Sequence, residues 1–166
     1  MVLSIPATVT VTFGATYPFP LLCPPSRVTK LLAQFAIAGI TIWNFYFRLF
    51  PGSIKAPQII EFLQHLLRHI GGKLIVIWDG LPVHRSKAVR EFVGNLDGQI
   101  HLEYLPAYAP ELNPVEYIWG YCKQHELPNF CPKDFAQLSV AARRALGRMR
   151  RRPTLVESFW KQAELF

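Results

Sequence analysis

The sequence predicts an α/β protein in which a mixed β-sheet is flanked by helices. The strongest observation is residues 74–78, five apolar residues that do not alternate with polar ones. Such a run is typical of a strand buried on both faces, as in a parallel sheet. A second observation is that residues 59–70 carry apolar side chains at helical spacing, which predicts an amphipathic helix. A third is the element order from residue 35 onward, β-β-α-β-α-β-α-α-α, because strands joined by crossover helices form α/β sheets.

Residues 1–27 form the least regular part of the chain. They contain five prolines and no acidic residue, so most of the segment is expected to be loop. Residues 9–13 alternate and are compatible with one further strand. We therefore expect an irregular N-terminal segment with at most a remnant first strand, an α/β core, and C-terminal helices with a basic face. These three parts cover residues 1–27, 28–130 and 131–166.

The first half of the core is predicted to hold a hairpin, a helix and the buried strand. Residues 35–42 and 45–50 are rich in β-branched and aromatic residues, which predicts two strands around a short break. Pro57 occupies a position that is favoured at the start of a helix. Gly71 and Gly72 follow the last apolar position and end that helix.

The second half of the chain is predicted to contain one strand and four helices. Residues 100–105 alternate between apolar and polar side chains, which indicates a strand. Ser86, Asn113 and Thr154 are candidate helix N-caps, and the spacing of Thr154 and Glu157 matches a capping box. The helices are expected over residues 87–93, from Pro114 onward, over 133–149 and over 155–164.

The net charge of +7 is concentrated near the C-terminal end of the chain. Six arginines lie between Arg143 and Arg152. Such a cluster is commonly a solvated helix face, but its density also suits contact with a polyanion. Residues 31–50 are mostly apolar, yet four polar residues interrupt them, so two buried strands are a better interpretation than a membrane span. The three cysteines form no Cys-x-x-Cys pair, which favours a reducing compartment without disulfides.

Two acidic residues stand out by their positions. Asp79 directly follows the buried strand, and the C-terminal tips of strands in open α/β sheets border the ligand crevice. Glu116 lies at the third position of a predicted helix. Two carboxylates in one crevice would bind a hard divalent cation. Each residue also has a simpler interpretation, because Asp favours turns and Asn113-x-x-Glu116 is itself a capping box.

The sequence around these two acids resembles a known family. The segment from Asp79 to Ser86 reads Asp-Gly-Leu-Pro-Val-His-Arg-Ser, and the segment from Tyr104 to Trp119 contains Pro-Ala-Tyr-Ala-Pro-Glu-Leu-Asn-Pro-Val-Glu. Both resemble the last two catalytic blocks of the DDE transposases of the mariner superfamily, and among these the bacterial insertion-sequence branch. The resemblance runs from about Gln34 to Lys123. It implies an RNase H-like fold and the cutting and joining of DNA strands with Mg²⁺, for which Mn²⁺ can substitute.

The resemblance gives Asp79 and Glu116 the roles of the second and third metal-binding carboxylates. The residues that follow the second carboxylate, His84 and Arg85, would face DNA or support the metal ligands. Lys123, after the third carboxylate, would meet a phosphate, and the arginine cluster would bind DNA. Each of these could instead be an ordinary loop or surface residue. The candidate DNA-contacting residues are His84, Arg85, Lys123, Arg143, Arg144 and Arg148.

The first carboxylate of the family is missing. Its members carry an Asp on the first strand, whereas no Asp or Glu precedes Glu61 here. We therefore expect an N-terminally truncated transposase whose first strand is missing or degenerate, and which is catalytically impaired on its own. The alternatives are a non-catalytic nucleic-acid-binding remnant and an RNase H-type nuclease. Expected partners are transposon-end and target DNA and a second copy of the chain in a synaptic complex. The expected location is the cytoplasm, at the nucleoid and not in a membrane.

Overall fold

The computed structural model describes residues 7–13, 35–41, 43–106 and 109–164. Its centre is a five-stranded sheet with the order β3-β2-β1-β4-β5. Strands β1 and β2 pair antiparallel, as do β2 and β3, whereas β1, β4 and β5 run parallel. The predicted mixed sheet is therefore confirmed. The strands are β1 (Ala7–Phe13), β2 (Phe35–Ile40), β3 (Phe45–Phe50), β4 (Leu74–Trp78) and β5 (Ile100–Tyr104).

Strand β1 settles whether the first strand is present. It lies in the middle of the sheet, where Val11 pairs with Trp78 of β4 and Thr12 pairs with Ala38 of β2. Its sequence, Ala-Thr-Val-Thr-Val-Thr-Phe, is rich in β-branched residues, which suit a strand. It carries no acidic residue. The strand is thus present and lacks the acid that the family places there. The loop predicted over 14–27 lies outside the described residues.

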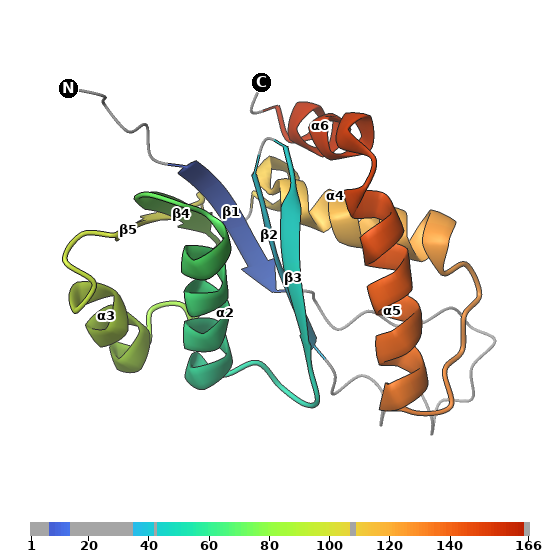
Figure 1. Cartoon of the computed structure of the whole chain (residues 1–166), viewed down its shortest axis with the longest axis horizontal. Coiled ribbons are helices and arrows are strands. Elements are labelled where there is room, and N and C mark those ends of the chain that lie inside the picture. The colour runs from blue at the N-terminus through green and yellow to red at the C-terminus, as the bar shows by residue number, and fades with distance from the viewer. Residues whose placement is uncertain (1–6, 14–34, 42, 107–108, 165–166) are drawn as a thin grey trace.

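Helices cover both faces of the sheet (Figure 1). Helices α2 and α3 pack on one face, and α4, α5 and α6 pack on the other. The helices are α2 (Ala56–His69), α3 (Lys87–Gly94), α4 (Pro114–Tyr121), α5 (Phe135–Arg150) and α6 (Pro153–Gln162). This three-layer arrangement is the predicted fold class, with helices on both sides of a sheet.

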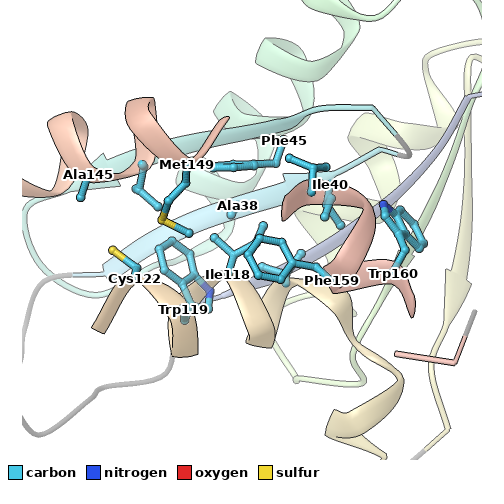
Figure 2. Packing of buried hydrophobic residues seen from close by; sticks show 13 residues of the cluster. Ala38, Ile40, Phe45, Ile118, Trp119, Cys122, Ala145, Met149, Phe159 and Trp160 are labelled. Carbon is cyan, nitrogen blue, oxygen red and sulfur yellow. The ribbon is translucent and has the colours of Figure 1, made fainter. Parts of the chain in front are cut away.

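The two layers of helices define two apolar cores. One core joins α2 and α3 to β4 through Leu74, Val76 and Trp78. The other joins β2 and β3 to the three C-terminal helices (Figure 2). The indole N–H of Trp160 in α6 donates a hydrogen bond to the carbonyl oxygen of Thr41, at 2.8 Å, so the last helix is fastened to the turn between β2 and β3.

Several predicted boundaries need correction. Thr154 is not the cap of α6, because the helix begins at Pro153 after Arg152, and proline at the first helical position supplies the start. The helix that begins at Pro114 also extends beyond the regular α-helix of α4, which ends at Tyr121. It continues as a π-helix over Cys122–Glu126, a wider turn that sequence periodicity does not reveal.

The cysteines also differ from expectation. Cys131 forms a disulfide, so the expectation of no disulfide is wrong at this position. Cys122 is a free buried thiol, and burial raises its pKa to about 12. In the described part of the chain, no helix is long and apolar enough to cross a membrane.

Candidate active site at the tip of strand β4

Asp79 follows β4 directly, and the strand determines the direction in which it points. Leu74, Val76 and Trp78 enter the core beneath α2 and α3. Successive side chains of a strand point to opposite faces, so continuing the alternation one residue past the end of β4 would turn position 79 toward the face that carries α4. Its side chain is 36% exposed, so the carboxylate is accessible at the strand tip.

The same face carries position 12 of β1. Thr12 pairs with Ala38, and Ala38 packs in the core that contains Val115 and Ile118 of α4. Paired residues of neighbouring strands share a face. The register of β1 with β4 ends at Val11 and Trp78, and one residue further along it would bring position 12 beside Asp79. We therefore expect the tip of β4, the C-terminal end of β1 and helix α4 to border one face of the sheet.

The carboxylate of Asp79 is held in place by the loop that follows it. Its Oδ1 atom accepts a hydrogen bond from the backbone N–H of Leu81 at 3.2 Å and lies 2.8 Å from Nδ1 of His84. The same Nδ1 lies 2.8 Å from the backbone carbonyl oxygen of Asp79. Both side-chain contacts use Oδ1, and in the described part of the chain no hydrogen bond is recorded to Oδ2. If Asp79 binds a cation, Oδ2 would be the oxygen to do so.

His84 is completely buried. Its ring lies on the indole of Trp78, with centroids 4.5 Å apart and planes 9° apart. A side chain without exposed surface does not reach a DNA phosphate. Of the two roles that the sequence suggested for His84, the geometry therefore favours support of Asp79 over direct contact with DNA.

Glu116 lies in the first turn of α4, after the buried N-cap Asn113. The side chain of Asn113 accepts a hydrogen bond from the backbone N–H of Val115 at 3.2 Å, which confirms the predicted cap. Glu116 is half-buried and acts electrostatically on Lys123, which lies further along the same helical segment. Burial lowers the pKa of Lys123, while the negative charge of Glu116 acts in the opposite direction. The third predicted carboxylate thus has a basic neighbour.

The donor set suits a hard cation only in part. Carboxylate oxygens are the ligands that Mg²⁺ prefers, and Asp79 offers one at a fixed position. Among the described residues, however, no group of three or more His, Cys, Asp or Glu side chains is placed to hold a metal. That Asp79 and Glu116 share one metal ion stays a prediction.

Arg85 lies on the surface beside this site. Its guanidinium group sits 4.8 Å from the centroid of the Tyr104 ring. A Cβ atom added at Gly80 would meet Nη2 of Arg85 at 3.3 Å, so the side chain folds back over the loop. Sequence reasoning placed Tyr104 in the strand and in the family block but gave it no role at the site, although an aromatic residue at the end of a strand beside the predicted site was the available signal.

The predicted basic cluster divides into two groups. Arg143 and Arg144 are exposed on α5, and Arg143 donates a hydrogen bond from Nε to Oγ of Ser139 at 3.1 Å. Arg148 instead donates from Nε to Oε2 of Glu126 at 2.8 Å, and its Nη2 lies 2.6 Å from the same oxygen.

Glu126 also lies 3.5 Å from Nη1 of Arg152, and its side chain is only 7% exposed. Part of the positive charge predicted for DNA is therefore engaged within the protein. Sequence reasoning missed Glu126 because its position depends on the π-helix.

Comparisons with known proteins agree with this geometry. Residues 36–139 match the family model described as DDE superfamily endonuclease. The search of curated proteins found no match. Among solved structures, the catalytic domain of Mos1 mariner transposase is similar, with a TM-score of 0.64 and 18% identity over 95% of this chain and 76% of that one.

Two further structures have the same fold. A Mos1 paired-end complex with the left transposon end gives a TM-score of 0.65 at 18% identity, over 95% of this chain and 51% of that one. A chain of the simian T-cell lymphotropic virus intasome gives 0.53 at 11% identity, over 86% of this chain and 48% of that one. The RNase H-like fold class predicted from the sequence is confirmed.

Proposed function

The chain belongs to the DDE superfamily of endonucleases, and from this we propose that it is a transposase catalytic domain whose substrate is DNA. The observation that carries the proposal is the carboxylate of Asp79 at the tip of β4, which His84 and the backbone N–H of Leu81 hold in place. Similar structures include complexes of Mos1 transposase with transposon-end DNA and with Mg or Mn. From the resemblance of the blocks at residues 79–86 and 104–119, we further propose that the chain comes from the bacterial insertion-sequence branch.

Asp79 and Glu116 are the residues that would hold Mg²⁺, or Mn²⁺ in its place. A bound divalent cation would activate the attacking oxygen and stabilise the leaving oxygen of a phosphodiester. The chain's own contribution is to fix Oδ1 of Asp79 through His84 and Leu81, which leaves Oδ2 in a constant direction. Holding a ligand on rigid elements matters because catalysis depends on placement to within a fraction of an ångström.

We further propose that the chain alone cleaves DNA poorly. Strand β1 carries no acid, so two carboxylates would have to balance the charge of two divalent cations. Mg²⁺ gives up its water ligands reluctantly, and a site with so little negative charge binds it weakly. The DNA partners would be the transposon ends and the target DNA. A second copy of the chain would join them in the synaptic complex, at the nucleoid in the bacterial cytoplasm.

A non-catalytic nucleic-acid-binding protein is the second candidate. The observation in its favour is that β1 lacks an acid while Lys123 adds a positive charge near Glu116. The two candidates differ in whether a cation binds at Asp79. A nuclease of the RNase H type shares the fold, but the proline-rich block around Asn113 resembles transposases.

Metal binding and plasmid nicking test the proposal together. Mn²⁺ binding is measured by electron paramagnetic resonance on the wild-type chain, Asp79→Asn and Glu116→Gln. Loss of bound Mn²⁺ in both variants is expected, with slow or absent nicking of supercoiled plasmid by all three. Asp97→Asn is the matched control, since Asp97 lies in the turn after α3. Mn²⁺ binding that neither substitution changes would contradict the catalytic assignment and favour the second candidate.

A further inference from the structure

An exposed cation–aromatic pair lies next to the Asp79 loop. Tyr104 is the last residue of β5 and pairs with Trp78 in the sheet register. It is 38% exposed, and the guanidinium group of Arg85 lies 4.8 Å from its ring centroid. In the described part of the chain no ion pair is recorded for Arg85, so its plane and charge are available at the surface.

The pair is rigidly linked to the carboxylate. The Tyr104 ring contacts Trp78, with centroids 6.2 Å apart and planes 40° apart. Trp78 also stacks on the buried ring of His84, which holds Asp79. A continuous series of flat groups therefore runs from His84 through Trp78 and Tyr104 to Arg85. The exposed end of this series keeps a fixed position relative to the candidate metal ligand.

We propose that Arg85 and Tyr104 form a stacking site for an unpaired nucleobase beside the phosphodiester bound at Asp79. A flat guanidinium group and an aromatic ring are the two surfaces on which proteins stack single-stranded bases. The paired bases of a duplex are already stacked on each other, so only a flipped or frayed base can use such a surface. Stacking tolerates any base, so the site selects for local unpairing and not for sequence. The inference rests on the proposed DNA substrate.

Binding assays with 2-aminopurine test the stacking site. One DNA duplex carries a single bulged 2-aminopurine, and a second carries the same base fully paired. Wild-type protein is expected to quench the fluorescence of the bulged base and to bind that duplex more tightly than the paired one. Tyr104→Leu and Arg85→Lys should reduce this preference about tenfold, as expected for loss of one stacked base. Tyr104→Phe keeps the ring and should retain the preference.

Two controls separate this inference from the proposed function. Trp43→Leu removes another exposed aromatic side chain, in the turn between β2 and β3, and should leave quenching unchanged. Circular dichroism confirms that each variant is folded. An unchanged preference in both Tyr104→Leu and Arg85→Lys would overturn the stacking site, while the Mn²⁺ measurements on Asp79→Asn still decide the metal site. If the wild-type chain binds neither duplex, DNA as the substrate is overturned as well.

Discussion

The imidazole ring of His84 lies flat on the indole ring of Trp78, with centroids 4.5 Å apart and planes 9° apart. This contact places Nδ1 of the histidine 2.8 Å from Oδ1 of Asp79. The residue before Asp79 and a residue five positions after it thus fix the carboxylate from within the core. The side chain of this candidate metal ligand is 36% exposed, but its orientation is determined by buried neighbours.

The first prediction concerns this brace. His84→Ala removes a buried stacking interaction and a hydrogen bond, and it should lower the free energy of unfolding by about 1–3 kcal/mol. The measurement is urea denaturation. His101→Ala is the control, because His101 contacts Glu103 at the same 2.8 Å but is exposed, and surface pairs contribute little. Equal effects of the two substitutions would contradict a supporting role for His84.

The second prediction concerns Glu126. Glu126→Gln weakens the interactions of a nearly buried carboxylate with Arg148 and Arg152. Both arginines are about half exposed, so we expect a loss of about 1–2 kcal/mol rather than the larger cost of breaking a fully buried pair. Glu157→Gln removes an exposed i,i+4 pair with Lys161 and should change stability by less than about 0.5 kcal/mol. Chemical denaturation of the two variants compares them directly.

The third prediction concerns the exposed arginines of α5. Arg143→Ala and Arg144→Ala should each flatten the dependence of DNA affinity on salt, by about 0.9 in the log–log slope for each phosphate that the variant no longer neutralises. Arg148→Ala should change the slope less, because Glu126 already binds that guanidinium group. Fluorescence anisotropy at several salt concentrations gives the slopes. Three unchanged slopes would identify the cluster as an ordinary solvated face.

The fourth prediction concerns pH. Burial lowers the pKa of His65 from 6.5 to about 4. Nearby groups add to this decrease in smaller measure, in the order His69, Arg48, Arg68 and Arg150. Tyr46 also packs against the ring. Between pH 6.5 and 4 the unfolded chain binds a proton at this histidine that the folded chain does not bind. Stability contributed by neutral His65 is therefore complete above pH 6.5 and falls as the pH decreases toward 4.

His65→Gln removes this titration and should reduce the loss of stability between pH 6.5 and 4. The comparison uses unfolding free energies of both proteins across that range, since carboxylates near pH 4 affect both alike. His125→Gln changes an exposed histidine and provides the control. The interpretation fails if wild type and His65→Gln lose stability in parallel.

Local patterns were sufficient to predict most elements of the fold. The unbroken apolar run of β4 and the Asn113 cap of α4 each determine local structure by themselves, and both are confirmed. The remnant strand in residues 9–13 was harder to predict. Its alternating pattern is weak, and its place in the centre of the sheet depends on pairing with β2 and β4, far along the chain.

The site was predictable only as far as its motif residues. Asp79 stands out in the sequence because it follows a buried strand. That His84 would be buried could not be read from the sequence, because an isolated histidine in a loop has no periodic partner. Likewise, the pairing of Glu126 with Arg148 joins residues 22 positions apart, and no local pattern encodes it.

The last prediction is that an acid at position 12 will strengthen metal binding. Thr12 pairs with Ala38, which packs in the core beneath α4, and continuing the β1–β4 register one residue past Val11 and Trp78 would bring position 12 beside Asp79. Neighbouring strands lie about 4.8 Å apart, so carboxylates at positions 12 and 79 could share one cation. A third carboxylate raises the negative charge of the site from −2 to −3, which favours a divalent ion that must give up water ligands.

Thr12→Asp should therefore bind Mn²⁺ at least about tenfold more tightly than the wild-type chain, a gain of about 1.4 kcal/mol. It should also nick supercoiled plasmid faster than the wild-type chain does. Thr12→Asn has nearly the same shape without the charge and should do neither. The double variant Thr12→Asp with Asp79→Asn should lose both gains, because the added acid is expected to act only together with Asp79. Tighter Mn²⁺ binding that survives loss of Asp79 would place the new site elsewhere, and would mean that β1 does not lie where the missing carboxylate is needed.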